Sequence, residues 1–268
     1  MSGVGADFFN KDFNLFDAIR RADDGDTNAM YSVIAYIAME DEGEQDLLEK
    51  KMEYVNRLIE SGDKAALIMK GDCYRDGKGV AKDAEKAMAL YNRAADAGIL
   101  FGYECIGQMY FFGDGVDVDY EKAYEFLTKH ADSLSPESTF LIGEMYRKGL
   151  FLPKDDKKAF DMYASIIKKN NTWMDDYYPL AAYMLAKYSA ENTNMGYDLK
   201  WAYDAIEYVR KNVQKPHILS DGEYLTIDMI EELWQKILRE KMRREHFISV
   251  RLKGVIIGVD GGTENRSP

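Results

Sequence analysis

The chain contains the stretch Gly71-Asp72-Cys73-Tyr74-Arg75-Asp76-Gly77-Lys78-Gly79-Val80 and repeats its pattern twice, each time 36 residues further on. The later copies are Gly107-Gln108-Met109-Tyr110-Phe111-Phe112-Gly113-Asp114-Gly115-Val116 and Gly143-Glu144-Met145-Tyr146-Arg147-Lys148-Gly149-Leu150-Phe151-Leu152. The register continues through Asp83/Asp119/Asp155, Lys86/Lys122/Lys158 and Ala87/Ala123/Ala159. A period of this length sets the architecture of a protein, because each repeat is one small structural unit that stacks on the next.

Each repeat has the features of two antiparallel helices joined by a turn. The first helix is predicted from about Lys64 to Asp76, with Gly71 in its middle, where a neighbouring helix must approach closely. Gly77 is placed to end this helix in a left-handed conformation, and Asp83 to cap the second helix. The second helix has apolar residues at helical spacing, namely Ala87, Leu90, Tyr91 and Ala94. One such pair cannot bury its apolar face alone, so the pairs are expected to stack.

The pattern Gly-x-x-Tyr-x-x-Gly-x-Gly-Val followed by Asp-x-x-Lys-Ala resembles the Sel-one-like repeat family, relatives of the tetratricopeptide repeats. The resemblance is strong over Asp63 to Asn170 and weaker on both sides. It implies an adaptor or scaffold for other proteins, without catalysis. The fold is accordingly expected to be all-α: a right-handed α-solenoid of about five stacked helix pairs over 22–212 with a C-terminal capping helix.

Weaker copies and departures define the remaining predictions about the fold. Upstream helices are expected from Asp26 to about Glu40 and from Asp46 to Ser61, after an N-terminal segment at 1–21. In the third repeat Phe151 replaces a turn glycine and Pro153 follows soon after, so another path is predicted for that turn.

The C-terminal part of the chain differs in character from the repeats. The residues after Pro216 contain a capping-box pattern at 220–223 and an amphipathic stripe to about Glu245, and we interpret the stripe as the capping helix. The part from Phe247 to Val259 is expected to be a strand or an extended segment, within a C-terminal region at 213–259, and 260–268 a disordered tail.

Composition and charge exclude several classes of protein. The 268 residues are 46% hydrophobic and 31% charged, as in packed proteins. Uninterrupted apolar runs are short, of the kind Val255-Ile256-Ile257, so no membrane span is predicted. The start of the chain does not resemble a secretion signal, so a cytoplasmic location is expected.

A net charge of −12 disfavours nucleic acid as a direct partner. Seven basic and two acidic residues from Lys236 to Lys253 give a local charge of +5, so the rest of the chain carries −17. This basic segment is either a solvated helix end or a contact site for an acidic partner.

Few residues suggest chemistry. His130, His217 and His246 show no metal-binding spacing, and His130 is interpreted as a partly buried structural residue. Cys73 and Cys105 are expected to be buried free thiols in a reducing compartment. The acidic turn at 114–119 lacks the glycine of a calcium loop, so neither a metal nor a cofactor is predicted.

The surface that we expect to bind a partner is the inner face formed by the first helices. Aromatic and arginine side chains are the usual anchors of a bound peptide or helix. Buried packing between repeats is the alternative for the phenylalanines. The candidate residues are Arg75, Phe101, Glu104, Gln108, Phe111, Phe112, Phe140, Arg147 and Tyr183.

Three functions follow from these patterns. The first is a non-enzymatic scaffold that holds a peptide or helix of a partner protein in the concave groove, with Arg75 and Arg147 setting its direction. The second is an acidic inhibitor that blocks a basic, nucleic-acid-binding type of surface by charge mimicry. The third is an enzyme with groove carboxylates such as Glu104 and Glu144, which no nucleophile or cofactor motif supports.

Overall fold

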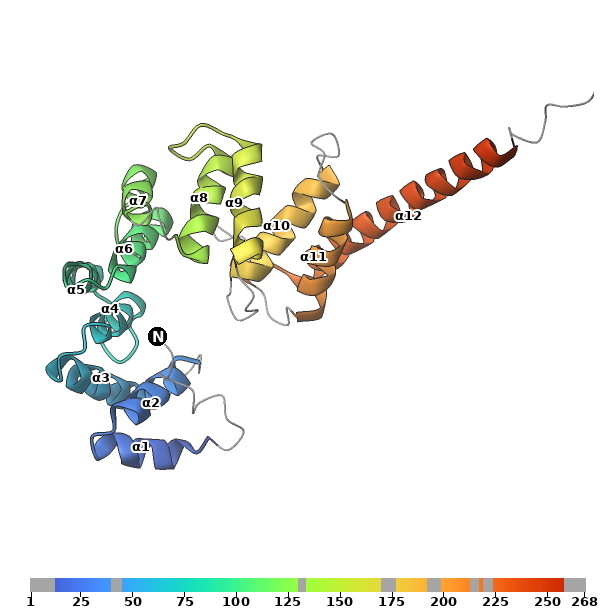
Figure 1. Cartoon of the computed structure of the whole chain (residues 1–268). Coiled ribbons are helices and arrows are strands. Elements are labelled where there is room, and N and C mark those ends of the chain that lie inside the picture. The colour runs from blue at the N-terminus through green and yellow to red at the C-terminus, as the bar shows by residue number, and fades with distance from the viewer. Residues whose placement is uncertain are drawn as a thin grey trace, which may run out of the picture. The chain divides into compact units, whose positions relative to one another are not determined.

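The computed structural model describes residues 13–39, 45–129, 134–169, 177–191, 199–212, 217–218 and 224–257. The chain divides into two compact units, Met1–Leu134 and Ser135–Pro268. Figure 1 labels the helices of both units. The described part of the first unit is helical, with α1 (Leu15–Asp23), α2 (Thr27–Met39), α3 (Gln45–Glu60), α4 (Ala66–Asp76), α5 (Ala84–Asp96), α6 (Phe101–Phe112) and α7 (Tyr120–Leu127).

The second unit has five helices and one small antiparallel strand pair among its described residues. The elements are α8 (Pro136–Lys148), α9 (Asp156–Lys169), α10 (Tyr177–Glu191), α11 (Leu199–Asn212), β1 (His217–Ile218), β2 (Tyr224–Leu225) and α12 (Ile227–Ile257). Within each unit, every helix packs against the next one along the chain, and α10 also contacts α8 and α12. The predicted all-α class and the stacked helix pairs are thus confirmed, while α1 lies in a segment for which the sequence predicted no helix.

Glycine lets the two helices of a repeat pack closely. A Cβ atom at Gly71 would lie 2.4 Å from the ring of Tyr91 on α5, and one at Gly107 would lie 2.7 Å from Leu127 on α7. Cys73 and Cys105 are both buried with free thiols, as predicted, and burial raises the pKa of the Cys73 thiol.

The turn of each repeat explains why its motif recurs. Gly77 has a φ of 73° and its backbone N–H donates to the Cys73 carbonyl, which ends α4. The backbone N–H of Asp83 donates to the Tyr74 carbonyl (2.8 Å), and its carboxylate accepts from the backbone N–H of Lys86 (2.9 Å). The Lys86 ammonium lies over the Tyr74 ring. The same contacts recur at Gly113, Tyr110, Asp119 and Lys122, and at Gly149, Tyr146, Asp155 and Lys158.

The prediction of another path for the third turn is wrong. Phe151 adopts a φ of 60°, close to the 78° of Gly79 and the 73° of Gly115. The backbone N–H of Asp155 still donates to the Tyr146 carbonyl at 2.9 Å, as in the other repeats. The turn therefore keeps its conformation and places a strained phenylalanine where glycine is the relaxed residue.

The C-terminal helix is longer than the sequence indicated. α12 continues without interruption to Ile257, so the prediction of a strand or extended segment after Phe247 is wrong over the described residues. The weak alternation there does not outweigh helix-forming arginine, lysine and leucine residues. α12 begins after Thr226, whose hydroxyl accepts from the backbone N–H of Met229 at 3.3 Å. The expected capping box at 220–223 and His130 lie outside the described part of the chain.

No helix among the described residues is both long and apolar enough to cross a membrane.

Candidate functional site

A polar triad links the two helices of the first clear repeat. The Tyr91 hydroxyl on α5 donates to the Asp72 carboxylate on α4 (2.8 Å), and Arg75 lies 3.5 Å from the same carboxylate. Arg75 also donates to Asp76 at 2.8 Å. Burial raises the pKa of Asp72, although Arg75 and the Tyr91 hydroxyl favour its ionised form. The guanidinium of Arg75 is thus held by carboxylates of its own helix.

The third repeat contains the same triad in a more buried form. Glu144 on α8 is 1% exposed and accepts from the Tyr163 hydroxyl of α9 at 2.6 Å. Arg147 donates to both Glu144 oxygens, at 2.8 and 2.6 Å. The Phe140 ring is fully buried, with its centroid 5.4 Å from that of Tyr163. Phe140 and Arg147 therefore contribute to packing within the repeat.

The middle repeat replaces this triad by less polar residues. Gln108, Phe111 and Leu127 occupy the positions of the acid, the arginine and the tyrosine, each 36 residues from its counterparts. The Nε2 atom of Gln108 is buried and has no hydrogen-bond partner in the described part of the chain. Phe111 is 2% exposed and packs edge-on against Tyr120 at 5.5 Å. At these positions the two helices of the middle repeat are therefore joined by apolar contacts instead of the polar triad.

α6, the first helix of the middle repeat, has two exposed aromatic rings. Phe101 at the start of α6 is 47% exposed, and Phe112 at its end is 37% exposed. They lie eleven residues apart, so they share one face and are separated by about 16 Å along the helix axis. Glu104 and Gln108 lie between them on this face and are half-buried. We call these four residues the α6 stripe.

The structure places eight of the nine residues predicted from the sequence in three groups. The α6 stripe brings four of them together, while Phe111 and Phe140 lie in the core and Arg75 and Arg147 belong to the triads. Phe111 and Phe112 separate because neighbouring residues on a helix point about 100° apart. The ninth residue, Tyr183, lies on α10 in the second unit and lines a pocket there.

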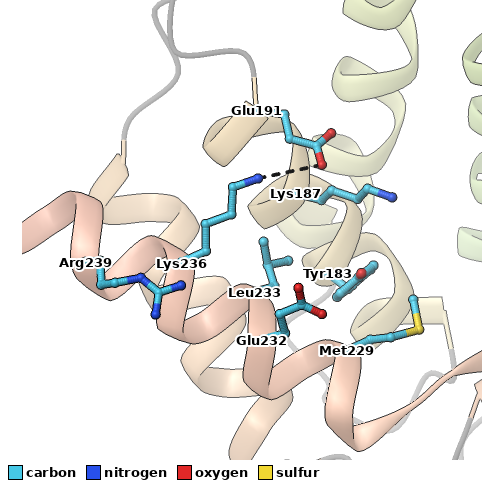
Figure 2. A pocket seen from close by; sticks show the side chains of 8 residues that line it. All are labelled: Tyr183, Lys187, Glu191, Met229, Glu232, Leu233, Lys236 and Arg239. Carbon is cyan, nitrogen blue, oxygen red and sulfur yellow. Dashed lines mark ion pairs between the residues drawn. The ribbon is translucent and has the colours of Figure 1, made fainter.

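This pocket lies between α10 and α12 and has a volume of about 260 Å³ (Figure 2). Lys236 reaches across it towards Glu191, with 4.0 Å between the ammonium and the carboxylate. The sequence pattern does not reveal the α12 side of the pocket, since an amphipathic stripe indicates only that one face of the helix is covered. The lining residues are Tyr183, Lys187 and Glu191 from α10, and Met229, Glu232, Leu233, Lys236 and Arg239 from α12.

Within the described residues, no three or more His, Cys, Asp and Glu side chains are grouped so that they could hold a metal ion.

Comparison with known proteins identifies the repeats. The Sel1 repeat family model matches residues 65–99, 106–133 and 136–171. The chain therefore contains three Sel1 repeats, and the predicted resemblance is confirmed. This family suggests a scaffold for protein–protein interaction. No curated protein matches the chain.

Two solved structures have a similar fold. A Sel1 repeat protein from Oxalobacter formigenes is 18% identical, with a TM-score of 0.55 over 74% of this chain and 84% of that protein. The immunity protein Pa5087 from Pseudomonas aeruginosa is 20% identical, with a TM-score of 0.50 over 80% of this chain and 82% of that protein. At these identities the likeness concerns the fold, which is the helical solenoid of Sel1 repeats.

Proposed function

We propose that the chain is a non-enzymatic protein-binding scaffold that holds a peptide or helix of a partner protein through the α6 stripe. The observation that carries this proposal is the pair of exposed phenylalanines, Phe101 and Phe112, at the two ends of one helix face. Exposed aromatic rings of this kind are typical anchors in protein interfaces.

The middle repeat differs from its neighbours in a way that favours this role. At the positions of Phe101 and Phe112, the first repeat has Ala65 and Asp76, and the third has Glu137 and Lys148. Only the middle repeat of these three therefore has an aromatic residue at both positions. A spacing of about 16 Å matches three turns of a partner helix, or five residues of an extended peptide.

The test is copurification of a partner with the full chain, followed by mass spectrometry to identify it. Phe101→Ala combined with Phe112→Ala is expected to abolish copurification, because each lost anchor costs about 2 kcal/mol or roughly 30-fold in affinity. Circular dichroism should be unchanged, since neither ring belongs to the buried core.

Phe16→Ala is the matched control, because Phe16 is 82% exposed on α1 and lies outside the stripe. It should retain the partner. Retention of the partner by the double variant, or its equal loss with Phe16→Ala, would refute the role of the α6 stripe.

The acidic inhibitor is the second candidate, favoured by the charge of −17 outside the basic segment. The similar structure from Pseudomonas aeruginosa is described as an immunity protein, but its likeness to this chain is one of fold. Binding by charge mimicry should weaken steeply as salt rises, whereas binding through the α6 stripe should change little. A salt titration of the isolated complex separates the two candidates.

A further inference from the structure

The α10–α12 pocket lies on the face of α10 that corresponds to the α6 stripe. Seven additional residues precede this repeat, so Lys187 corresponds to Glu144 and Gln108, at an offset of 43 from Glu144. Tyr183 and Glu191 lie four residues before and after Lys187, which places all three on one face of α10. They are the three α10 residues that line the pocket.

α12 supplies the opposite wall and is itself anchored in the core. Ile230, Leu233 and Ile237 are almost fully buried, and α12 packs against both α10 and α11. In the last repeat, part of the face that is open on α6 is therefore covered by the chain's own helix. A space beside Leu233 and Met229 stays unfilled, and Figure 2 shows the side chains of the two helices around it.

The charges around this space leave positive groups available. Lys187 and Arg239 form no ion pair within the described chain. Lys236 pairs with Glu191, with 4.0 Å between the ammonium and the carboxylate. Lys236 and Glu191 are about half exposed, so water screens their attraction. Three cations and two carboxylates line the pocket of a protein whose net charge is −12.

We propose that this pocket binds an apolar side chain flanked by carboxylates on a partner polypeptide. A volume of about 260 Å³ is below the usual range for cofactor sites and accommodates a single large side chain. Leu233 and Met229 supply apolar contact, and Lys187 and Arg239 attract the flanking carboxylates. The inference extends the proposed function to a second contact, since it presumes that the chain binds polypeptides.

The test uses the synthetic peptide acetyl-Glu-Leu-Glu-Leu-Glu-amide and its neutral counterpart acetyl-Gln-Leu-Gln-Leu-Gln-amide. The full chain is labelled with ¹³C at methionine methyl groups, and the Met229 signal is assigned by Met229→Leu. The acidic peptide is expected to shift the Met229 signal in a saturable manner and to bind at least five-fold more tightly than the neutral one. Equal binding of the two peptides, or shifts only at other methionines, would overturn the proposal.

Charge variants test the two cations. Lys187→Gln combined with Arg239→Gln should weaken the acidic peptide about ten-fold, whereas Lys187→Arg should retain binding. Lys157→Gln is the matched control, because Lys157 is an exposed lysine of α9 outside the pocket. An unchanged affinity in the double variant counts against the site. The peptide test uses a synthetic probe and not the copurified partner. A negative result at the pocket would therefore leave the copurification test of Phe101 and Phe112 unaffected.

Discussion

Equivalent residues in two repeats lie in different surroundings, and this decides what each contact contributes. The Asp72 side chain is 35% exposed and remains in contact with water. Glu144 is 1% exposed, and its carboxylate lies against Arg147 and Lys148 and accepts a hydrogen bond from the Tyr163 hydroxyl. A buried carboxylate that loses a donor pays a larger desolvation cost than one that water reaches.

Removal of the Tyr163 hydroxyl is therefore expected to destabilise the protein more than removal of the Tyr91 hydroxyl. Tyr163→Phe should lower the free energy of unfolding by about 1–3 kcal/mol, and Tyr91→Phe by about 0.5–1.5 kcal/mol. Urea denaturation followed by circular dichroism measures both. If Tyr91→Phe cost as much as Tyr163→Phe, the burial of Glu144 would not be the determining factor.

At the scale of the element, the turn of the third repeat is strained. Phe151 has a φ of 60°, in the region that side chains with a Cβ atom avoid, and its side chain is 53% exposed. A residue other than glycine in the left-handed region costs about 1–2 kcal/mol. Glycine would remove this strain but would add entropy to the unfolded chain, which offsets about 0.4–1 kcal/mol.

We therefore expect Phe151→Gly to be more stable than Phe151→Ala by about 1 kcal/mol. Both variants remove the ring, so their difference isolates the backbone conformation. Thermal unfolding measures the difference. An alanine variant equal to or more stable than the glycine variant would show that this turn does not strain the backbone.

The helix pairs follow from the sequence because each motif residue has a local backbone role. Gly77 ends α4, Asp83 caps α5, and Gly71 gives room for Tyr91, so spacing alone locates the helices. The exposure of the phenylalanines does not follow in this way. Phe111 and Phe112 are neighbours of the same type, and the fold buries Phe111 against Tyr120 while it leaves Phe112 37% exposed.

The sequence pattern also did not predict the length of α12 or the pocket beside it. The apolar stripe at Ile230, Leu233 and Ile237 predicted a buried helix face, and these residues are buried. The space next to Leu233 arises from how α12 lies against α10, which is a long-range contact that no local pattern encodes. Similarly, the turn at Phe151 keeps the hydrogen bond from the backbone N–H of Asp155 to the Tyr146 carbonyl. This conformation prevails over the preference of phenylalanine for a negative φ.

At the scale of the whole molecule, carboxylates with lowered pKa values recur along the chain. Hydrogen bonds from Lys86 lower the pKa of Asp83, and those from Lys122 lower the pKa of Asp119. The pKa of Asp23 is lowered mainly by a hydrogen bond from the Tyr54 hydroxyl, and that of Glu231 by one from Arg210. Asp72 differs, since burial raises its pKa, and its effect on the pH dependence of stability opposes that of the other carboxylates.

The direction of these shifts predicts how stability depends on pH. A carboxylate whose pKa is lower in the folded state stabilises the fold at pH values above its ordinary pKa of 3.8. This stabilisation is lost as the pH falls through the lowered pKa. The urea midpoint should therefore fall continuously from about pH 5 to pH 2. Asp83→Asn with Asp119→Asn keeps both helix caps but does not titrate, so its midpoint should depend less steeply on pH. A midpoint that stays constant or rises on acidification, or an equal slope in the double variant, would show that these caps do not control acid stability.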